Sequence, residues 1–431
     1  MKSKNWSLLI GVIYFVALSI FQSTEAQNVI NNGNAIVVNQ GAYFIVGGDF
    51  VNKTATVEGR VDIDGTILLD GNFINYSTNQ VFVNQEAVPD GRVVMRNNTI
   101  TQSIAGTQPT HFENIEMHGS NKILEATNSG AQGVLLLDAV FKLNSNNFIL
   151  YNNQPTAINH VSNYILSETN SVDGYGTLDW KIGGQTSAYS IPFGTGSTNS
   201  DDVELKYISQ IAGSPSTAGI KFATYPSGDR YNLPYPTGIS SLSPYEPLNV
   251  SDRYWITDAD DYVSRPFSSL IFKYTNHDVE SGNSIIESNL KAIRASSGDA
   301  SWASVPPAGI VSPDINTMSV MNIPVGSWRT NWTMTSIEVG GEFWVPSAYT
   351  PNEDGQNDVF APVFGFIPTN YTLDLFDRWG ELIYSTHYFK QGWDGIYKGE
   401  LAQQAVYVWK ITMVKPDGKE YTYHGNFTLI R

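Results

Sequence analysis

Residues 65–75 read GTILLDGNFIN, and the same arrangement returns in GAYFIVGGDFVN from Gly41 and in GVLLLDAVFKLN from Gly133. In the stretches from Gly65 and Gly133, an Asp stands five residues after the glycine and a Phe stands eight residues after it. Gly41 and Gly65 are 24 residues apart, and the 68 residues from Gly65 to Gly133 are close to three times 23. GRVVMRNNTI, which begins at Gly91, falls near the expected phase.

Short strands at regular spacing with Asn and Gly corners are typical of a β-solenoid, because each coil must bury its apolar face on the next coil. We expect a solenoid-like stack from about Asn28 to Asn153, inside a repeat region 27–174, with about five coils of roughly 24 residues. An antiparallel meander is the alternative, since it also gives strand and turn signals every 8–12 residues or so.

The rest of the chain is also predicted to be all-β, because runs rich in Val, Ile, Phe, Tyr and Thr alternate with Gly, Asn, Ser and Thr. A length of 431 residues suggests three domains of roughly 150 residues. In residues 175–340, DVELKY and SLIFKY alternate with period two, which predicts an antiparallel β-sandwich. Residues 341–431 hold five further strand candidates, which suits a small sandwich of immunoglobulin-like size.

The first 26 residues have the order of a secretory signal peptide: a basic start with Lys2 and Lys4, an apolar run from Trp6 to Phe21, then Thr-Glu-Ala. Cleavage is expected between Ala26 and Gln27. An uncleaved anchor helix is the alternative, but the apolar run falls short of the roughly 20 residues needed to span a bilayer. No later apolar run is long enough to span.

Composition restricts the chemistry. The chain has no cysteine, which excludes disulfides, thiolate metal sites and cysteine nucleophiles. Its net charge is −16, and removing the signal peptide, whose own charge is +1, leaves −17. Nucleic acids and anionic membranes need Lys and Arg for neutralisation, so neither is expected as a partner.

TPNEDGQNDVF, residues 350–360, gathers oxygen-bearing side chains around Gly355. Such ligands beside a glycine turn suit Ca²⁺, and the candidates are Asn352, Asp354 and Asp358. The EF-hand spacing is not met, because Thr350 stands at the first carboxylate position and no Glu closes the site. The alternative is a network of Asx turns that includes Asn357.

Two short segments carry a tryptophan beside a charged residue: DRWG, with Arg378 and Trp379, and GWDG, with Trp393 and Asp394. The tryptophans can serve as a stacking surface for sugars or as part of a docking hot spot. Alternatively, each fills a core and Arg378 pairs with a carboxylate.

Catalysis has little support in the sequence. Asp258, Asp260 and Asp261 are paired carboxylates of the kind that cleave glycosidic bonds, but adjacent Asp residues in a turn are usually only solvated. H-E-x-x-H, G-x-S-x-G and a phosphate-binding glycine loop are all missing from the sequence. We therefore expect a protein that is not an enzyme and has no cofactor, calcium being the one candidate ion.

Taken in order, FWVPSAYTPNEDGQNDVF, LDLFDRWGELIYS, GWDGIYKGE, VYVWKI and the terminal GNFTLIR closely resemble the gliding-motility-associated C-terminal domain. This is the type B sorting domain of the type IX secretion system of Gram-negative bacteria. The resemblance covers residues 341–431. It departs mildly from the family pattern at Tyr349, where Phe is frequent, and at ELIYS, where a VFES-like run is more usual.

The resemblance implies that the domain is a secretion address. After Sec export, the chain would cross the outer membrane through the type IX translocon, dock on an outer-membrane β-barrel of the PorP/SprF kind and stay on the outer face of that membrane. The residues that match the family motifs and are expected to form scaffold and docking surface are Pro351, Asn352, Asp354, Gly355, Asn357, Asp358, Arg378, Trp379, Gly380, Trp393, Asp394 and Gly395.

The leading hypothesis is a secreted, surface-retained protein with an adhesive or structural role and no catalytic activity. Two alternatives remain. One is a polysaccharide-binding or polysaccharide-degrading surface protein, with an extracellular glycan as partner. The other is an accessory component of the gliding or secretion machinery, because a family name does not assign one role to every member.

Overall fold

The structure is a computed structural model of the 431-residue chain. It describes residues 27–54, 59–82, 90–160, 163–168, 174–196, 202–228, 231–280, 282–299, 301–336, 343–352, 357–364, 368–415 and 420–431. Strands make up 48% and helices 5%, which confirms the all-β prediction. The chain forms two compact units, residues 1–334 and 335–431. The predicted signal peptide, with Ala26 at its cleavage site, lies outside the described residues and stays a prediction.

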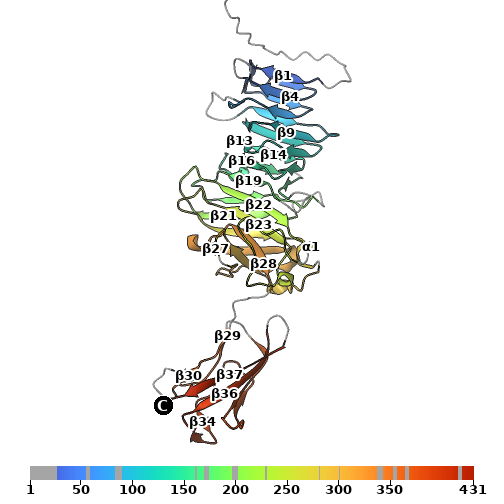
Figure 1. The fold of residues 1–431 in the computed structure, drawn as a ribbon. Coiled ribbons are helices and arrows are strands. Elements are labelled where there is room, and N and C mark those ends of the chain that lie inside the picture. Colours follow the sequence, from blue (N-terminus) through green and yellow to red (C-terminus); the bar gives the residue numbers. More distant parts are fainter. Residues whose placement is uncertain are drawn as a thin grey trace, which may run out of the picture. The chain divides into compact units, whose positions relative to one another are not determined.

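The first unit begins as a parallel β-solenoid of about five turns, as predicted (Figure 1). The coils contribute strands to three faces. The first face has seven parallel strands: β1 (Val29–Asn32), β4 (Phe50–Lys53), β7 (Phe73–Asn75), β9 (Gln102–Gly106), β12 (Lys122–Leu124), β15 (Phe141–Lys142) and β18 (Ile165–Leu166). The second has six: β3 (Tyr43–Val46), β6 (Thr66–Leu69), β8 (Arg92–Met95), β11 (Asn114–His118), β14 (Leu135–Asp138) and β17 (Ile158–His160).

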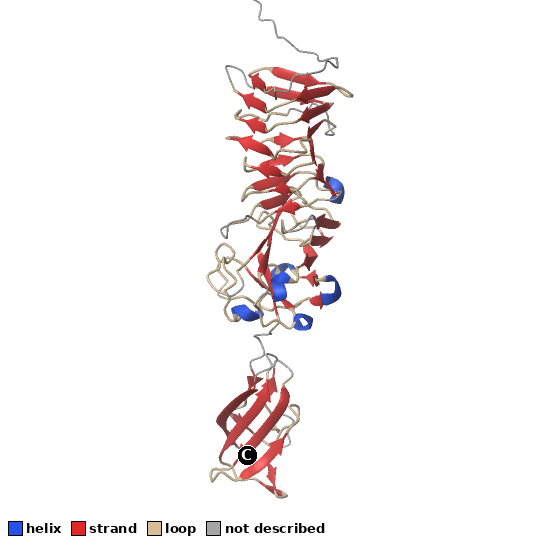
Figure 2. Cartoon of the chain, turned by 90° about the vertical axis from the view of Figure 1, so that its right-hand side faces the viewer, coloured by secondary structure: helices blue, strands red, loops and turns tan. Residues whose placement is uncertain are grey.

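The third face is built in two pieces. β2 (Ala35–Val38) pairs with β5 (Arg60–Ile63), and further on β10 (His111–Phe112), β13 (Ser129–Ala131), β16 (Asn147–Leu150) and β19 (Thr177–Trp180) pair in parallel. Parallel pairing therefore continues past Asn153, as far as β19. Figure 2 shows the strands as successive layers along the stack.

The register explains the sequence repeat. On the second face, Phe44 faces Ile67, which faces Val93 in the next coil, and the column continues to Ile158. Each step advances the chain by 20 to 26 residues, and the predicted period of roughly 24 residues lies in this range. GRVVMRNNTI supplies β8, in the predicted phase. Because side chains alternate between two faces of a strand, equal register sends the same apolar positions inward in every coil.

The repeated Phe and Gly have separate roles. Phe50 and Phe73 stack inside the solenoid with ring centroids 5.1 Å apart, and both are fully buried. Gly91 lies so close to the preceding coil that a Cβ there would stand 1.9 Å from the carbonyl oxygen of Ile63. The glycine is needed because the corner leaves no room for a side chain.

An asparagine ladder crosses the first three coils. Asn31, Asn52 and Asn75 occupy one register position and are buried. Asn52 Nδ2 donates to Asn75 Oδ1 at 3.3 Å, and Asn75 Nδ2 donates to the carbonyl oxygen of Pro109 at 2.8 Å. In the next coil Gly106 takes the position. The amides thus satisfy buried backbone groups at a coil corner, where β-ladder bonds end.

We predict that Asn75→Ala lowers the free energy of unfolding by about 2–3 kcal/mol, because it leaves buried donors and acceptors of its neighbours without partners. Urea denaturation followed by circular dichroism measures the change. Asn34→Ala, at an exposed position next to the same ladder, is the control and is expected to change stability by less than about 0.5 kcal/mol. Equal effects of the two substitutions would contradict the role of the ladder.

One buried carboxyl group inside the solenoid has a strongly raised pKa. Glu113 is 2% exposed, and its Oε2 accepts a hydrogen bond from the backbone N–H of Gly91 at 3.0 Å. Burial raises the pKa of Glu113 to about 7, and the nearby carboxylates Asp90, Asp64 and Asp62 add to the increase. Between the unfolded value of 4.5 and this value, the folded chain binds more protons than the unfolded chain. Stability from this group is therefore lost as the pH rises through that range.

We expect Glu113→Gln to keep the acceptor for Gly91 and to remove this pH dependence. At pH 8, about one unit above the folded pKa, the variant should melt roughly 2–6 °C higher than the parent. Near pH 4, where the carboxyl is protonated in both states, the two should melt at similar temperatures. Thermal denaturation of both proteins across this range is the measurement. A constant difference at every pH would show that Glu113 does not titrate as its burial requires.

Beyond the solenoid, the third face continues as an antiparallel sheet. β19 pairs with β22 (Ile220–Pro226), and the strand order runs on through β23 (Arg253–Asp258), β28 (Asn331–Thr335) and β25 (Lys291–Ala295). A second antiparallel sheet has the order β20 (Ala188–Ile191), β21 (Leu205–Ile211), β24 (Phe267–Lys273), β27 (Thr317–Ile323) and β26 (Ile310–Ser312). DVELKY overlaps the start of β21 and SLIFKY the end of β24, and the two strands pair antiparallel.

The two sheets contact each other through aromatic side chains. Tyr207 of β21 lies 5.8 Å from Phe222 of β22, and Phe272 of β24 lies 5.2 Å from Trp255 of β23, centroid to centroid. These side chains belong to the same buried core as the inward residues of the solenoid. Short helices lie in the connections: α1 (His277–Glu280) and the 3₁₀ turns η1 (Pro155–Ala157), η2 (Pro247–Asn249), η3 (Glu287–Asn289), η4 (Pro313–Ile315) and η5 (Val325–Ser327).

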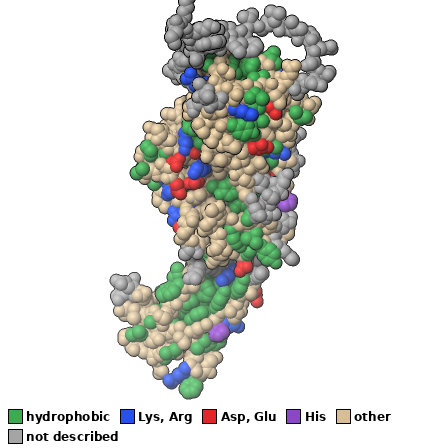
Figure 3. Space-filling view, turned by 45° about the horizontal axis from the view of Figure 1, so that its top comes forward, with side chains coloured by type: hydrophobic (Ala, Val, Ile, Leu, Met, Phe, Trp, Pro, Cys, Tyr) green, Lys and Arg blue, Asp and Glu red, His purple; other side chains and the backbone are tan. Residues whose placement is uncertain are grey.

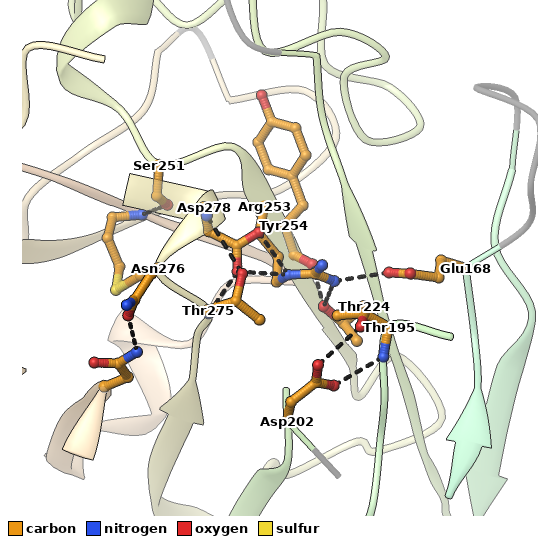
Figure 4. A network of polar contacts seen from close by, with 12 residues as sticks. Glu168, Thr195, Asp202, Thr224, Ser251, Arg253, Tyr254, Thr275, Asn276 and Asp278 are labelled. Carbon is orange, nitrogen blue, oxygen red and sulfur yellow. Dashed lines mark hydrogen bonds and ion pairs between the residues drawn. The ribbon is translucent and has the colours of Figure 1, made fainter. Parts of the chain in front are cut away.

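A buried ionic network joins the last coil to the antiparallel part (Figure 4). Arg253 is 2% exposed, and its Nη1 lies 2.9 Å from Glu168, just after β18. Its Nε lies 3.0 Å from Asp278 in α1. Asp278 also accepts hydrogen bonds from the backbone N–H and hydroxyl of Thr275. Burial raises the pKa of Glu168, and the charge of Arg253 opposes that shift.

The second unit is organised around one five-stranded sheet. Its order is β30 (Ala348–Tyr349), β37 (Glu420–Leu429), β36 (Val406–Val414), β32 (Thr369–Phe376) and β33 (Leu382–Thr386). Two small antiparallel pairs accompany it: β29 (Phe343–Trp344) with β31 (Val363–Phe364), and β34 (Ile396–Tyr397) with β35 (Glu400–Leu401). The predicted strands are thus present, while the immunoglobulin-like arrangement stays a prediction.

Candidate functional site

The candidate site lies in the second unit, where the two tryptophan segments have opposite environments. Trp393 is 1% exposed and packs against Tyr349, Tyr407 and Phe427. Its Nε1 donates to the carbonyl oxygen of Ile396 at 2.8 Å, so the one polar atom of the ring is satisfied. The alternative of a core-filling tryptophan therefore describes Trp393.

The turn after Trp393 is fixed by its neighbours. Asp394 Oδ1 accepts from the backbone N–H of Ile396 at 3.0 Å, which closes an Asx turn. Gly395 has φ of +82°, and a Cβ there would meet the Pro351 ring and the Tyr349 hydroxyl at 3.0 Å. Arg431 Nη2 donates to the Gly395 carbonyl oxygen at 3.1 Å. GWDG thus joins the 350–360 segment, the core and residue 431.

DRWG forms a tight turn between β32 and β33. Asp377 Oδ1 accepts from the backbone N–H groups of both Trp379 and Glu381 at 2.8 Å. Gly380 has φ of +82°, a conformation that favours glycine. The carboxylate of Asp377 therefore shapes the turn, and the side chain of Trp379 is left outside the core.

Trp379 is 80% exposed, compared with 61% for Trp344. The guanidinium carbon of Arg378 lies 5.1 Å from the Trp379 ring centroid, which is a cation–π contact. The two side chains line a pocket of about 250 Å³ together with Tyr397, Leu401 and other residues of the β34–β35 segment. An exposed tryptophan beside an arginine and a pocket is typical of a protein-docking hot spot.

Further exposed apolar side chains lie on the same sheet, where Val406 and Val408 occupy the face opposite to Tyr407 of the pocket. Leu382 lies beside Phe376 across β32 and β33, and Phe376 lies beside Val408 of β36. We call the exposed set the tryptophan edge; its members are Trp379, Leu382, Leu401, Val406 and Val408. Figure 3 shows hydrophobic side chains over much of the visible face of this unit, with few charged ones between them. Figure 1 shows β34 and β29 at opposite ends of the unit.

The 350–360 segment is only partly described, and Asp354 and Gly355 lie outside the described residues. Asn352 donates its backbone N–H to Asp358 Oδ1 at 3.0 Å, and Asn357 adopts φ of +55°. The Thr350 N–H donates to the Asn357 carbonyl oxygen at 3.0 Å. The Asp358 carboxylate bonds an N–H six residues earlier in the chain and so is not an Asx turn. The Asx-turn network and calcium both stay predictions.

The ionic contacts near the turn are exposed. Glu381 Oε1 accepts from the Tyr397 hydroxyl at 2.7 Å and from Lys398 Nζ at 3.0 Å. Those two hydrogen bonds lower the pKa of Glu381, with the Tyr397 bond the larger cause. They also tie β33 to the β34–β35 pair, on which Leu401 is carried.

The sequence identified Trp379 and Arg378 but missed the other members of the tryptophan edge. Leu401 lies in the two-residue strand β35, whose pairing with β34 is not visible in any periodic pattern. Val406 and Val408 belong to VYVWKI, where apolar residues occupy both faces of the strand. That continuous apolar run was the available signal, because a strand with one solvated face normally alternates.

Comparison with known proteins identifies the second unit. Residues 343–429 match the CHU_C type IX secretion signal domain. No similar protein is found among curated proteins. The C-terminal unit therefore implies interaction with the type IX secretion system and a cell-surface or extracellular location. Within the described residues, no helix has the length and hydropathy of a membrane span.

We predict that Trp393→Ala costs the second unit about 3–5 kcal/mol, because it empties the centre of a small aromatic core. Trp379→Ala is the matched substitution at an exposed position and should cost less than about 0.5 kcal/mol. Thermal unfolding of the two full-length variants, followed by near-ultraviolet circular dichroism, compares them. If Trp379→Ala destabilises the unit as much as Trp393→Ala, the tryptophan edge is part of the fold and not a free surface.

Proposed function

We propose that the chain is a surface-retained protein of the type IX secretion system, with a C-terminal docking unit and an N-terminal unit that acts outside the cell. The observation that carries this proposal is the type IX secretion signal domain at residues 343–429. The docking partner we propose is an outer-membrane β-barrel of the PorP/SprF kind. The tryptophan edge is the surface that would contact it.

The physical basis for docking is the exposed apolar surface. Trp379 and Leu401 are 80% and 68% exposed. Removing such apolar surface from water is favourable, so these side chains gain free energy when a partner covers them. Trp and Arg are also the residues that dominate binding energy in protein interfaces. The turn made by Asp377 holds Trp379 in place before docking, which lowers the entropic cost of binding.

For residues 27–334 we propose an adhesive or structural role without catalysis. Stacked coils with aligned backbone hydrogen bonds form a stiff support, and the antiparallel part shares their core. Outward side chains of β3, Tyr43 and Ile45, give this support an exposed apolar patch at its first coil. Such a patch suits contact with another surface.

Protease accessibility on intact cells tests export. Cells produce the full chain, a chain ending at Thr335, Trp379→Ala, or Trp344→Ala. Trp344 is also exposed, at 61%, but lies on β29. We expect the full chain and Trp344→Ala to reach the surface, the truncated chain to stay inside, and Trp379→Ala to fall several-fold. Equal surface exposure of the truncated chain would refute the secretion address. Equal exposure of Trp379→Ala alone would refute the tryptophan edge as the docking surface.

A further inference from the structure

The first unit contains a pocket of about 650 Å³ on the eight-stranded sheet. Its lining comes from β19, β22, β23 and β28 and from the segments after β23 and β25. The lining residues are both aromatic and charged, and they are separate from the tryptophan edge. The volume lies within the usual range for small-molecule sites, roughly 300–1,000 Å³.

The pocket exists because the cover of the sheet stops partway along its strands. On the face turned away from the main core, Ala223, Ile256 and Ile293 belong to a small second core, which Tyr245 and Trp302 help to close. Two residues further along the same face of β22 and β23, Lys221 pairs with Asp258, and both line the pocket. A closed apolar cluster therefore gives way to an open polar hollow on the same face.

The apolar part of the pocket is rigid. Ile256 and Trp328 are 3% and 1% exposed, and the Trp328 Nε1 donates to the carbonyl oxygen of Thr257 at 3.1 Å. Tyr175 stacks on Tyr225 with ring centroids 5.0 Å apart and an interplanar angle of 7°. The base of the pocket is therefore fixed, and the partly exposed Tyr175 offers the carbon surface, so little entropy is lost when a ligand packs on it.

The polar part consists of three opposite-charge pairs. Arg265 lies 2.7 Å from Asp260, and Lys221 lies 3.8 Å from Asp258. The third pair, Arg329 and Asp299, is 2.7 Å apart. The charged lining residues therefore sum to zero. The Arg265 Nε, a buried donor, has no hydrogen-bond partner in the described structure.

We propose that this pocket binds a neutral sugar unit of a glycan. A sugar ring presents C–H surface to Tyr175, and its hydroxyls both donate and accept. The three pairs match this chemistry, because their carboxylates accept and their guanidinium and ammonium groups donate.

Other ligand classes fit less well. A phosphate or carboxylate ligand needs cations that are not already neutralised, whereas each cation here has a carboxylate within 4 Å. A peptide added as an extra strand needs a free sheet edge, but β22, β23 and β28 are interior strands. The inference deepens the proposed function by assigning a class of ligand to the first unit. It rests on the proposed function only in that the glycan is met outside the cell.

Isothermal titration calorimetry on the purified full-length protein tests the site independently of export. The probes are short neutral oligosaccharides of glucose, mannose, galactose or xylose, with uronic-acid oligosaccharides and inorganic phosphate as the charged arms. The pocket variants are Arg265→Gln and Asp260→Asn; the side chain of Asp260 is 68% exposed, so its replacement should leave the fold intact. The controls are Lys206→Gln and Glu204→Gln, from an ion pair at β21 with a separation of 3.3 Å.

We expect a neutral oligosaccharide to bind, both pocket variants to weaken it about tenfold or more, and both controls to match the parent. The proposal is overturned if no neutral oligosaccharide binds, if phosphate or uronates bind more tightly, or if a folded Asp260→Asn protein binds as the parent does. Because the protein is purified, a failure of export leaves this result unaffected. Loss of binding likewise leaves the secretion address intact.

Discussion

The backbone hydrogen bonds between successive coils are the constraint on which the first unit depends. A parallel ladder sends one register position of every coil to the same side, so Phe44, Ile67 and Val93 must all be inward residues. The corners then allow little variation, and Gly91 is required where the preceding backbone is closest. Asn52 and Asn75 meet the same constraint with amides, which bind the backbone groups that a bend leaves without ladder partners. A chain without cysteine thus gains its stability from repeated burial.

A stack of coils exposes an apolar end unless something covers it, and here the chain changes strand direction to do so. β19 is the last parallel strand of the third face, and β22 pairs with it antiparallel. The sheet therefore continues without a break in its hydrogen bonds, and the core of the solenoid runs into the space between the two antiparallel sheets. Arg253 sits at this transition with Glu168 and Asp278. Buried ion pairs of this kind add little net stability, but removal of one member would leave an uncompensated charge, so they favour a single arrangement of the joined parts.

The second unit shows how one local pattern serves two purposes. Trp379 and Trp393 both stand beside a charged residue in a glycine turn, yet one is 80% and the other 1% exposed. The difference arises from the packing around each turn. Asp377 closes a tight hairpin whose tip leaves Trp379 largely exposed, whereas the GWDG segment crosses the core and pairs with Phe360. The first tryptophan is consequently available to a partner, and the second fixes the frame that presents it.

The sequence by itself determined the all-β class, the solenoid and its approximate period, the strands of the C-terminal unit and the secretion signal. The fold properties depend on residues close in the chain or on a spacing that repeats, so alternation and periodicity record them. The secretion signal is recognised instead by ordered motifs that resemble a known family. The tertiary structure alone decided which tryptophan is buried, which apolar side chains join Trp379 at the surface, and that Arg265, Arg329 and Lys221 meet around one pocket. Those outcomes depend on contacts between segments far apart in sequence, such as the 3.1 Å hydrogen bond from the Thr330 N–H to the Ser296 hydroxyl beside the same hollow. A local pattern cannot specify them, because the free energy that selects a partner comes from burial in the assembled fold.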